Sequence, residues 1–187
     1  MLVLASASPR RREILRNAGI DFVVQATVIP EIPNPGEDPR EFAERMAREK
    51  ARIVWRERPQ DFVLGADTVV VVEEEILGKP ESPAEAARML RMLSGRTHVV
   101  ITGVCLFGPG NLCDVRSEMT LVTMDAIHEP QILAYAGSDE PKDKAGAYAI
   151  QGIASRWISR IEGDYFNVVG LPMSLVYKML RQHGAIG

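Results

Sequence analysis

Apolar and polar positions follow two rhythms along the chain, one typical of β-strands and the other of α-helices. Short apolar runs bounded by turn residues predict strands, and these runs span residues 2–5, 22–26, 62–66, 69–72, 98–107 and 113–123. Apolar residues spaced three and four positions apart predict helices, and these segments span residues 9–18, 39–56, 83–93, 130–136 and 171–183. The alternation of strands with helices indicates an α/β protein.

Turn-forming residues set the expected boundaries between these segments. Residues 29–36 contain three prolines, which exclude a regular element there. The acidic run 73–75 is expected at a solvated hairpin tip, and the helix over residues 39–56 is expected to bury one face. That face comprises Phe42, Met46, Ile53 and Val54. No internal repeat or long linker divides the chain, so one domain over residues 1–187 is expected.

Composition narrows the class of protein. The 187-residue chain has 46% hydrophobic and 25% charged residues, as an ordinary folded domain does. Its net charge of -3 argues against a broad nucleic-acid-binding surface, which needs an excess of basic residues. No apolar run approaches the roughly 20 residues of a membrane span, and no signal peptide is recognisable. Cys105 and Cys113 match no metal or disulfide spacing, so both are expected in the core of a protein from a reducing cytoplasm.

Three consecutive arginines stand at an unfavourable place near the start of the first predicted helix. Ser8 is a suitable N-cap and Pro9 a suitable first helical residue. Each exposed cation there costs roughly 0.3–1 kcal/mol, because the helix dipole is already positive. The simpler interpretation is a basic helix start that nearby acids compensate. The alternative is a phosphate site, with Arg10 and Arg11 facing the ligand and Arg12 facing solvent.

Several other polar residues are candidates for chemistry. Asp67 interrupts an apolar strand pattern, where it is either a turn-forming residue or a metal ligand or general base. The neighbouring hydroxyl of Thr68 either contacts a ligand or only satisfies the strand. Lys50, Lys79 and Glu31 would each, taken alone, be ordinary surface residues. Together with the arginines they suggest a site for phosphates and a metal.

Gln151 lies in a segment of small residues that lets the backbone approach a ligand. Its amide carries both a donor and an acceptor, so it could recognise the edge of a nucleobase, although a surface glutamine is the simpler interpretation. All these residues in one protein outline a nucleotide-hydrolysing site. The chain has no G-x-x-x-x-G-K-[ST] motif and no G-x-G-x-x-G motif after a strand, so it is not a P-loop protein.

Six stretches of the chain resemble, in order and spacing, the successive motifs of the Maf family of nucleoside triphosphate pyrophosphatases. They read LASASPRRREIL, AREKA, GADTVVVVEEEILGKP, MLRMLSGRTHVVITGV, DEPKDKAGAYAIQGI and IEGDYFNVVGLP. A single such motif would be weak support. Because the six cover nearly the whole chain, the sequence is identified as a member of this family.

The resemblance implies a cytoplasmic enzyme that cuts a nucleoside triphosphate between the α and β phosphates, releasing the monophosphate and pyrophosphate. It implies a divalent cation, Mg²⁺ or Mn²⁺, as cofactor, and a protein that is often a homodimer. The implied fold is a single α/β domain with an elongated, curved mixed sheet flanked by helices. Two lobes would surround a central cleft, as in the similar inosine triphosphate pyrophosphatases.

The resemblance also assigns roles to residues at matching positions. Asp67 matches the proposed proton acceptor of the family. Our hypothesis is that Glu31 and Asp67 hold the divalent ion, a role of Asp67 that competes with the first, because a carboxylate bound to a metal is a poorer base. The positions of the polar substrate and metal site are Ser8, Arg11, Glu31, Lys50 and Lys79. The positions linked to substrate choice are Arg10, Thr68 and Gln151.

The stretch YAIQG resembles the subfamily that acts on dTTP and UTP, whereas the subfamily that acts on 7-methyl-GTP has a different pattern there. Two departures stand out: Pro30 replaces a frequent acid, which leaves one carboxylate fewer, and Ala149 replaces a frequent glycine. The alternatives are a 7-methyl-GTP pyrophosphatase and a nucleotide-binding regulator of septum formation without turnover. Intact Asp67, Glu31 and Lys79 argue against the regulator, which needs no hydrolytic residues.

Overall fold

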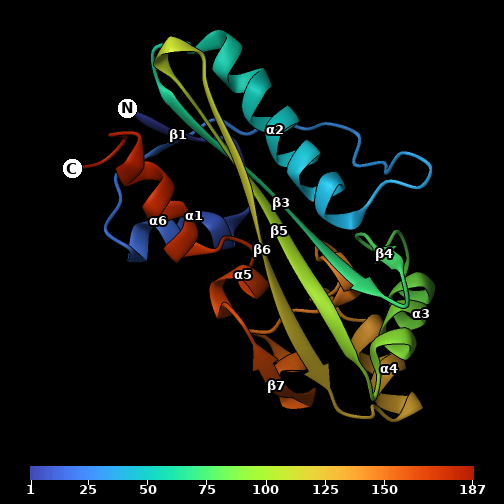
Figure 1. The fold of residues 1–187 in the computed structure, drawn as a ribbon. Coiled ribbons are helices and arrows are strands. Elements are labelled where there is room, and N and C mark those ends of the chain that lie inside the picture. The colour runs from blue at the N-terminus through green and yellow to red at the C-terminus, as the bar shows by residue number, and fades with distance from the viewer. The chain divides into compact units, whose positions relative to one another are not determined.

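The computed structural model describes residues 1–187 and contains one seven-stranded sheet and six α-helices (Figure 1). The strands are β1 (Leu2–Leu4), β2 (Val23–Val24), β3 (Phe62–Val72), β4 (Glu75–Leu77), β5 (Thr97–Gly108), β6 (Leu112–Met124) and β7 (Ile158–Glu162). The α-helices are α1 (Pro9–Asn17), α2 (Pro39–Glu57), α3 (Pro83–Leu93), α4 (Glu129–Ala136), α5 (Tyr165–Val169) and α6 (Met173–Gln182). Short 3-10 helices are η1 (Pro109–Asn111), η2 (Ala145–Ala147) and η3 (Ile153–Trp157). This composition confirms the expected α/β class.

The sheet is mixed, with strand order β2-β1-β3-β5-β6-β7 and with β4 paired to β3. Strand β1 runs parallel to both of its neighbours, so that Val3 lies opposite Val23 on one side and Val63 on the other. Strands β4 and β7 pair antiparallel with β3 and β6. None of the helices combines the length and apolar composition that crossing a lipid bilayer would require.

The chain forms two compact units. Unit 1 comprises Met1–Thr68, Thr102–Glu118 and Gly170–Gly187, and unit 2 comprises Val69–Ile101 and Met119–Val169. Strands β3, β5 and β6 each supply residues to both units. A single domain over residues 1–187, with an elongated curved sheet and two lobes around a cleft, stays a prediction.

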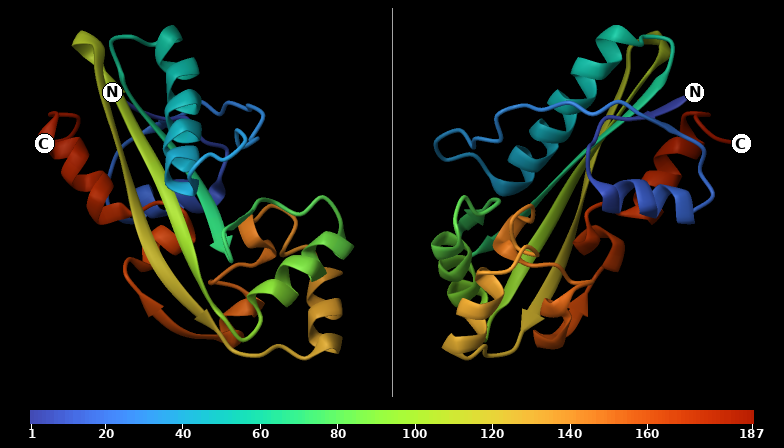
Figure 2. Two further views of the ribbon diagram at one scale, coloured as in Figure 1. Left: turned by 45° about the vertical axis from the view of Figure 1, so that its right-hand side comes forward. Right: turned by 180° about the vertical axis from the view of Figure 1, so that it is seen from behind.

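In unit 1, helix α2 lies along the long strands at unusually close range (Figure 2). A Cβ on Gly65 would lie 2.3 Å from the carbonyl oxygen of Ala47, and one on Gly103 would lie 2.4 Å from that of Ala43. Glycine on the strands and alanine on the helix therefore permit this contact. The same packing holds Lys50, which α2 carries on its buried face, against β3.

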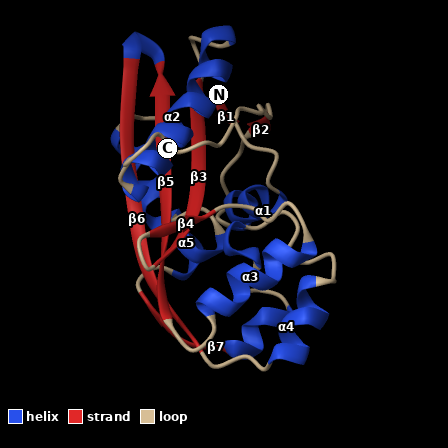
Figure 3. Ribbon diagram, turned by 90° about the vertical axis from the view of Figure 1, so that its right-hand side faces the viewer, coloured by secondary structure: helices blue, strands red, loops and turns tan.

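In unit 2, helices α3 and α4 pack against each other, as Figure 3 shows. Helix α3 begins and ends as predicted, with the Ser82 hydroxyl accepting a hydrogen bond from the Glu85 N–H at its start. The loop after α4 leads to η2, where Gly146 has φ = +69° and would place a Cβ 3.0 Å from Val70. A residue with a side chain would be strained there.

Strand β3 differs from the sequence expectation, which divided it in two around Asp67 and Thr68. It runs unbroken from Phe62 to Val72. An unpaired carboxylate would be costly inside an apolar strand, but Asp67 accepts a hydrogen bond from the Lys50 ammonium group. The two-segment prediction and the turn-forming alternative for Asp67 are therefore wrong.

Other expectations also need correction. Ile53 is 40% exposed, because it lies about 100° around the helix from the buried Val54. Cys105 is buried as expected, but Cys113 is exposed near the start of β6. Strand β2 is shortened to two residues, and both β7 and α5 were not predicted, because five residues are too few for a clear periodicity.

Candidate active site

Helix α1 begins as the sequence predicts. The Ser8 hydroxyl accepts a hydrogen bond from the Arg11 N–H at 3.4 Å, and Pro9 occupies the first turn. Ser8 thus serves as the N-cap. Arg12 donates from Nη2 to the Ala7 carbonyl oxygen at 3.0 Å. The Arg10 side chain is half-buried.

The side chain of Arg11 is buried rather than extended into solvent. Its Nε donates to the Gly170 carbonyl oxygen at 2.8 Å, and its Nη1 donates to the Ala66 carbonyl oxygen at 2.9 Å and to Ser6 Oγ at 3.2 Å. Its Nη2 donates to Thr68 Oγ1 at 3.0 Å. Four of the hydrogen bonds that a guanidinium group offers are therefore made within unit 1. Arg11 thus joins the start of the chain to β3 and to Gly170. The sequence predicts that its side chain faces a phosphate and gives no sign of these contacts.

Thr68 lies at the centre of these contacts. Its hydroxyl accepts from Arg11, lies 2.9 Å from Thr102 Oγ1, and donates to the Gly170 carbonyl oxygen at 3.4 Å. Gly170 has φ = +125°, a conformation open to glycine but strained for other residues. Sequence reasoning did not single out Gly170, although a glycine directly before Leu-Pro is a recognisable turn signal.

Lys50 brings two of the predicted carboxylates together. Its Nζ donates to Asp67 Oδ1 at 2.5 Å and to Glu31 Oε1 at 2.6 Å. The lysine comes from α2, the aspartate from β3 and the glutamate from the proline-rich loop. Lys50 is 7% exposed and Asp67 6% exposed, whereas the Glu31 side chain is 34% exposed. The cluster is thus closed on the side of the sheet and open on the side of the loop.

Burial changes the ionisation of two of these groups. It raises the pKa of the Asp67 carboxyl, while the charges of Lys50 and Arg11 act in the opposite direction. Burial also lowers the pKa of the Arg11 guanidinium, which the Asp67 carboxylate opposes. A carboxyl with a raised pKa is better suited to accept a proton than an ordinary aspartate.

The loop that carries Glu31 is held by an ion pair that sequence reasoning missed. Arg45 on α2 donates from Nε and Nη2 to the two carboxylate oxygens of Glu37, at 2.6 and 2.7 Å. Its Nη2 also donates to the Ile32 carbonyl oxygen at 3.1 Å, directly beside Glu31. The Asn34 N–H donates to Glu37 at 2.8 Å. The hydrogen bonds from Arg45 lower the pKa of Glu37 to about 2. No local pattern reveals this pair, because Glu37 precedes the helix that carries its partner.

Glu31 and Asp67 suit a divalent cation chemically. Their carboxylates already converge on one positive charge, the Lys50 ammonium group. Mg²⁺ is commonly held by one or two carboxylates together with phosphate oxygens and water. No group of three histidine, cysteine, aspartate or glutamate side chains is arranged as a metal site, and Pro30 supplies no carboxylate. The two carboxylates therefore fit a metal that arrives with a phosphate-bearing ligand.

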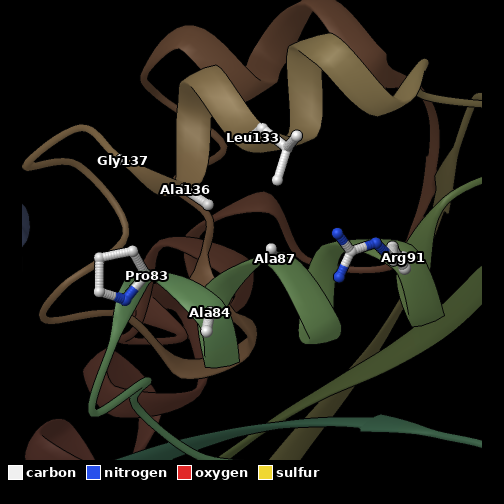
Figure 4. A pocket seen from close by; sticks show the side chains of 7 residues that line it. All are labelled: Pro83, Ala84, Ala87, Arg91, Leu133, Ala136 and Gly137. Atoms are coloured by element: carbon white, nitrogen blue, oxygen red, sulfur yellow. The ribbon is translucent and has the colours of Figure 1, made fainter.

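The remaining candidates belong to unit 2. Lys79 follows β4 and is exposed, and Gln151 is exposed in the loop between η2 and η3. Unit 2 also has an apolar pocket between α3 and α4, shown in Figure 4. It is lined by Pro83, Ala84, Ala87, Arg91, Leu133, Ala136 and Gly137, and so by none of the predicted site residues.

A family model described as Maf-like protein matches residues 1–183. This chain belongs to the Maf family. A relative from Koribacter versatilis (strain Ellin345), named dTTP/UTP pyrophosphatase, is 55% identical over 185 residues, covering 99% of this chain and 95% of its own. Relatives with the same name from Symbiobacterium thermophilum and Geobacter sulfurreducens are 50% and 48% identical, covering 98% and 99% of this chain and 94% and 97% of their own.

The fold of this Maf-family chain is similar to that of a HAM1 protein from Coxiella burnetii. The TM-score is 0.50, and the match covers 97% of this chain and 98% of the other at 18% sequence identity. At this identity the likeness concerns the fold alone, and it confirms the expected mixed α/β architecture.

Proposed function

We propose that this chain is a nucleoside triphosphate pyrophosphatase that hydrolyses dTTP and UTP to the monophosphate and pyrophosphate. The observation that carries the proposal is the buried Asp67 beside Lys50 and Glu31 in a member of the Maf family. The substrate is supported by full-length relatives named dTTP/UTP pyrophosphatase. From its membership of the Maf family, we also propose that the enzyme is cytoplasmic and forms a homodimer.

The charges of the cluster suit a substrate that brings its own counter-cation. Arg11 and Lys50 supply two positive charges, which Asp67 and Glu31 balance. Such a neutral site has little attraction for a free triphosphate. Glu31 and Asp67 would hold the divalent cation, Mg²⁺ or Mn²⁺, which neutralises phosphate charge and makes bound water more acidic. The Lys50 ammonium group has three N–H donors, of which Glu31 and Asp67 take two, and the third would donate to a phosphate oxygen.

Asp67 is the proposed general base, a role that competes with metal binding because a carboxylate bound to a metal is a poorer base. It accepts a proton from the water whose oxygen attacks the α phosphorus, and the bond to the bridging oxygen breaks as pyrophosphate leaves. Lys50 holds the Asp67 carboxylate in place, and Arg10, Arg11, Lys79 and the N-terminus of α1 provide positive charge for the phosphates. Arg11 contributes chiefly by holding Thr68 and the helix start at Ser8 in place, because most of its side-chain donors are used within the protein.

Gln151 is the proposed reader of the base. Its amide offers one acceptor and two donors, which complement the N3–H and carbonyl oxygens of thymine and uracil. Cytosine presents the opposite polarity at two of these positions. A site built around such bonds rejects a base that leaves its polar groups unpaired. Thr68 is the second proposed contributor to substrate choice, together with Arg10.

The test is hydrolysis of dTTP, UTP, CTP, the purine triphosphates and 7-methyl-GTP with Mg²⁺ or Mn²⁺, with the products identified. We expect monophosphate and pyrophosphate from dTTP and UTP. Turnover of 7-methyl-GTP alone would keep the reaction and overturn the base assignment. Binding of nucleotides without any product would overturn the enzymatic proposal and favour a regulatory protein. Omission of the metal with excess chelator is the control for the cofactor.

A further inference from the structure

Gln151 lies in the middle of a segment of unit 2 whose two ends are bound by the same pair of side chains. The Ala149 N–H donates to the Tyr135 hydroxyl oxygen at 3.2 Å, and the Ile153 N–H donates to Glu140 Oε2 at 3.1 Å. The Tyr135 hydroxyl in turn donates to Glu140 Oε1 at 2.8 Å. The pair therefore joins the residue two positions before Gln151 to the residue two positions after it.

The segment is also tight inside. The Gly152 N–H donates to the Ala149 carbonyl oxygen at 3.1 Å, which closes a turn around Gln151. A Cβ on Gly152 would lie 2.2 to 2.5 Å from the carboxylate atoms of Glu140. Only glycine leaves room for that carboxylate in its present position. Gly152, the residue after Gln151, is thus constrained by the Glu140 side chain, which also binds the Ile153 N–H at the end of the segment.

The Tyr135–Glu140 pair is itself held by contacts with the rest of unit 2. Tyr135 belongs to α4, is 3% exposed and packs edge-to-face on Trp157, with ring centroids 5.3 Å apart. Burial, together with the nearby Glu140, raises the pKa of Tyr135, so its hydroxyl remains a donor at neutral pH. The Glu140 carbonyl oxygen accepts from Lys144 Nζ at 2.7 Å, which ties the glutamate's backbone down as well.

We propose that Tyr135 and Glu140 are positioning residues that set the discrimination among pyrimidine bases by fixing the backbone on both sides of Gln151. Neither residue needs to touch the substrate. An exposed amide on a free loop would lose backbone conformational entropy on binding. With the segment held at both ends, the Gln151 side chain starts from one fixed Cα position, so the backbone does not shift to accommodate a mismatched base. The inference rests on the proposed role of Gln151 in base recognition.

The test compares kcat/KM for dTTP with kcat/KM for CTP, because a merely structural defect would lower both and leave their ratio unchanged. Tyr135→Phe keeps the packed ring and removes only the hydroxyl. Since one hydrogen bond is worth roughly 1 kcal/mol, we expect this variant to lower the ratio about fivefold. Thr120→Val is the matched control. It also removes a buried hydroxyl of unit 2, but one bonded to the Asp164 backbone and to Asn167, and it should leave the ratio unchanged.

Gly152→Ala tests the same contact from the other side. Its methyl group should displace the flexible Glu140 carboxylate rather than the backbone, and so lower the ratio as Tyr135→Phe does. In a Glu140→Ala background, where nothing remains to displace, adding Gly152→Ala should have little further effect. Independent effects of the two changes would overturn the proposal, as would equal effects of Tyr135→Phe and Thr120→Val on the ratio.

Gln151→Ala distinguishes failure of this inference from failure of the proposed function. If Gln151→Ala leaves the ratio unchanged, the base assignment is wrong and the inference is overturned with it. If Gln151→Ala lowers the ratio while Tyr135→Phe and Gly152→Ala do not, the base assignment stands and only the positioning role is overturned.

Discussion

Replacing Glu37 by glutamine tests how the proline-rich loop keeps Glu31 beside Lys50. The change removes the negative charge that Arg45 binds through two parallel hydrogen bonds, and it leaves the size of the side chain almost unchanged. The loop has no regular secondary structure over residues 29–36, and this pair connects it to α2 together with the Lys50–Glu31 pair.

The magnitude follows from the pKa of Glu37, which falls from 4.5 to about 2 in the folded protein. At 1.36 kcal/mol for each pKa unit, this lowering corresponds to roughly 3 kcal/mol of stability. Since the Arg45 side chain is 21% exposed, solvent screens the pair and we expect Glu37→Gln to cost about 1–2 kcal/mol at pH 7. The lowered pKa means that this contribution is present above pH 4.5 and is lost as the pH falls towards 2.

Urea unfolding of both proteins at pH 7 and at about pH 3 measures this difference, which should shrink at the lower pH. Glu49→Gln is the matched control. Glu49 pairs with the same arginine at 3.3 Å, but through a single contact of a side chain that is 35% exposed, so its loss should cost at most about 0.5 kcal/mol. Equal costs for the two variants, or a difference independent of pH, would refute the assigned role of Glu37.

Two further substitutions test the cluster itself. Asp67→Asn should reduce turnover at least a hundredfold, because the amide cannot accept the proton. The protein should remain folded, because burial already disfavours the charged form of Asp67. Activity within tenfold of the parent would show that Asp67 is neither base nor essential ligand. Arg11→Lys should destabilise the protein by about 2–3 kcal/mol in urea unfolding, because an ammonium group cannot reach Gly170, Ala66 and Thr68 at once. A loss below 0.5 kcal/mol, on the order of a surface change, would contradict this account of Arg11.

Local sequence signals determined most of the secondary structure of this protein. Helix α3 has its predicted bounds because Ser82 caps one end and Ser94-Gly95 ends the other. The prolines of residues 29–36 exclude a regular element, as expected. These features depend on backbone dihedral preferences and on hydrogen bonds between near neighbours, which a single sequence reveals directly. The motif residues of the candidate site were recognised by resemblance to the Maf family, and this resemblance rests on the order and spacing of the motifs.

Only the tertiary structure decided which of these residues meet. It made β3 continuous through Asp67, because Lys50 from a separate helix supplies the counter-charge. It turned Arg11 inward, because three carbonyl and hydroxyl groups from distant segments converge on its guanidinium group. The Arg45–Glu37 and Tyr135–Glu140 pairs escaped sequence reasoning for the same reason. A charge or hydroxyl shows its own chemistry in the sequence, but its partner is chosen by the packing of elements that lie far apart along the chain.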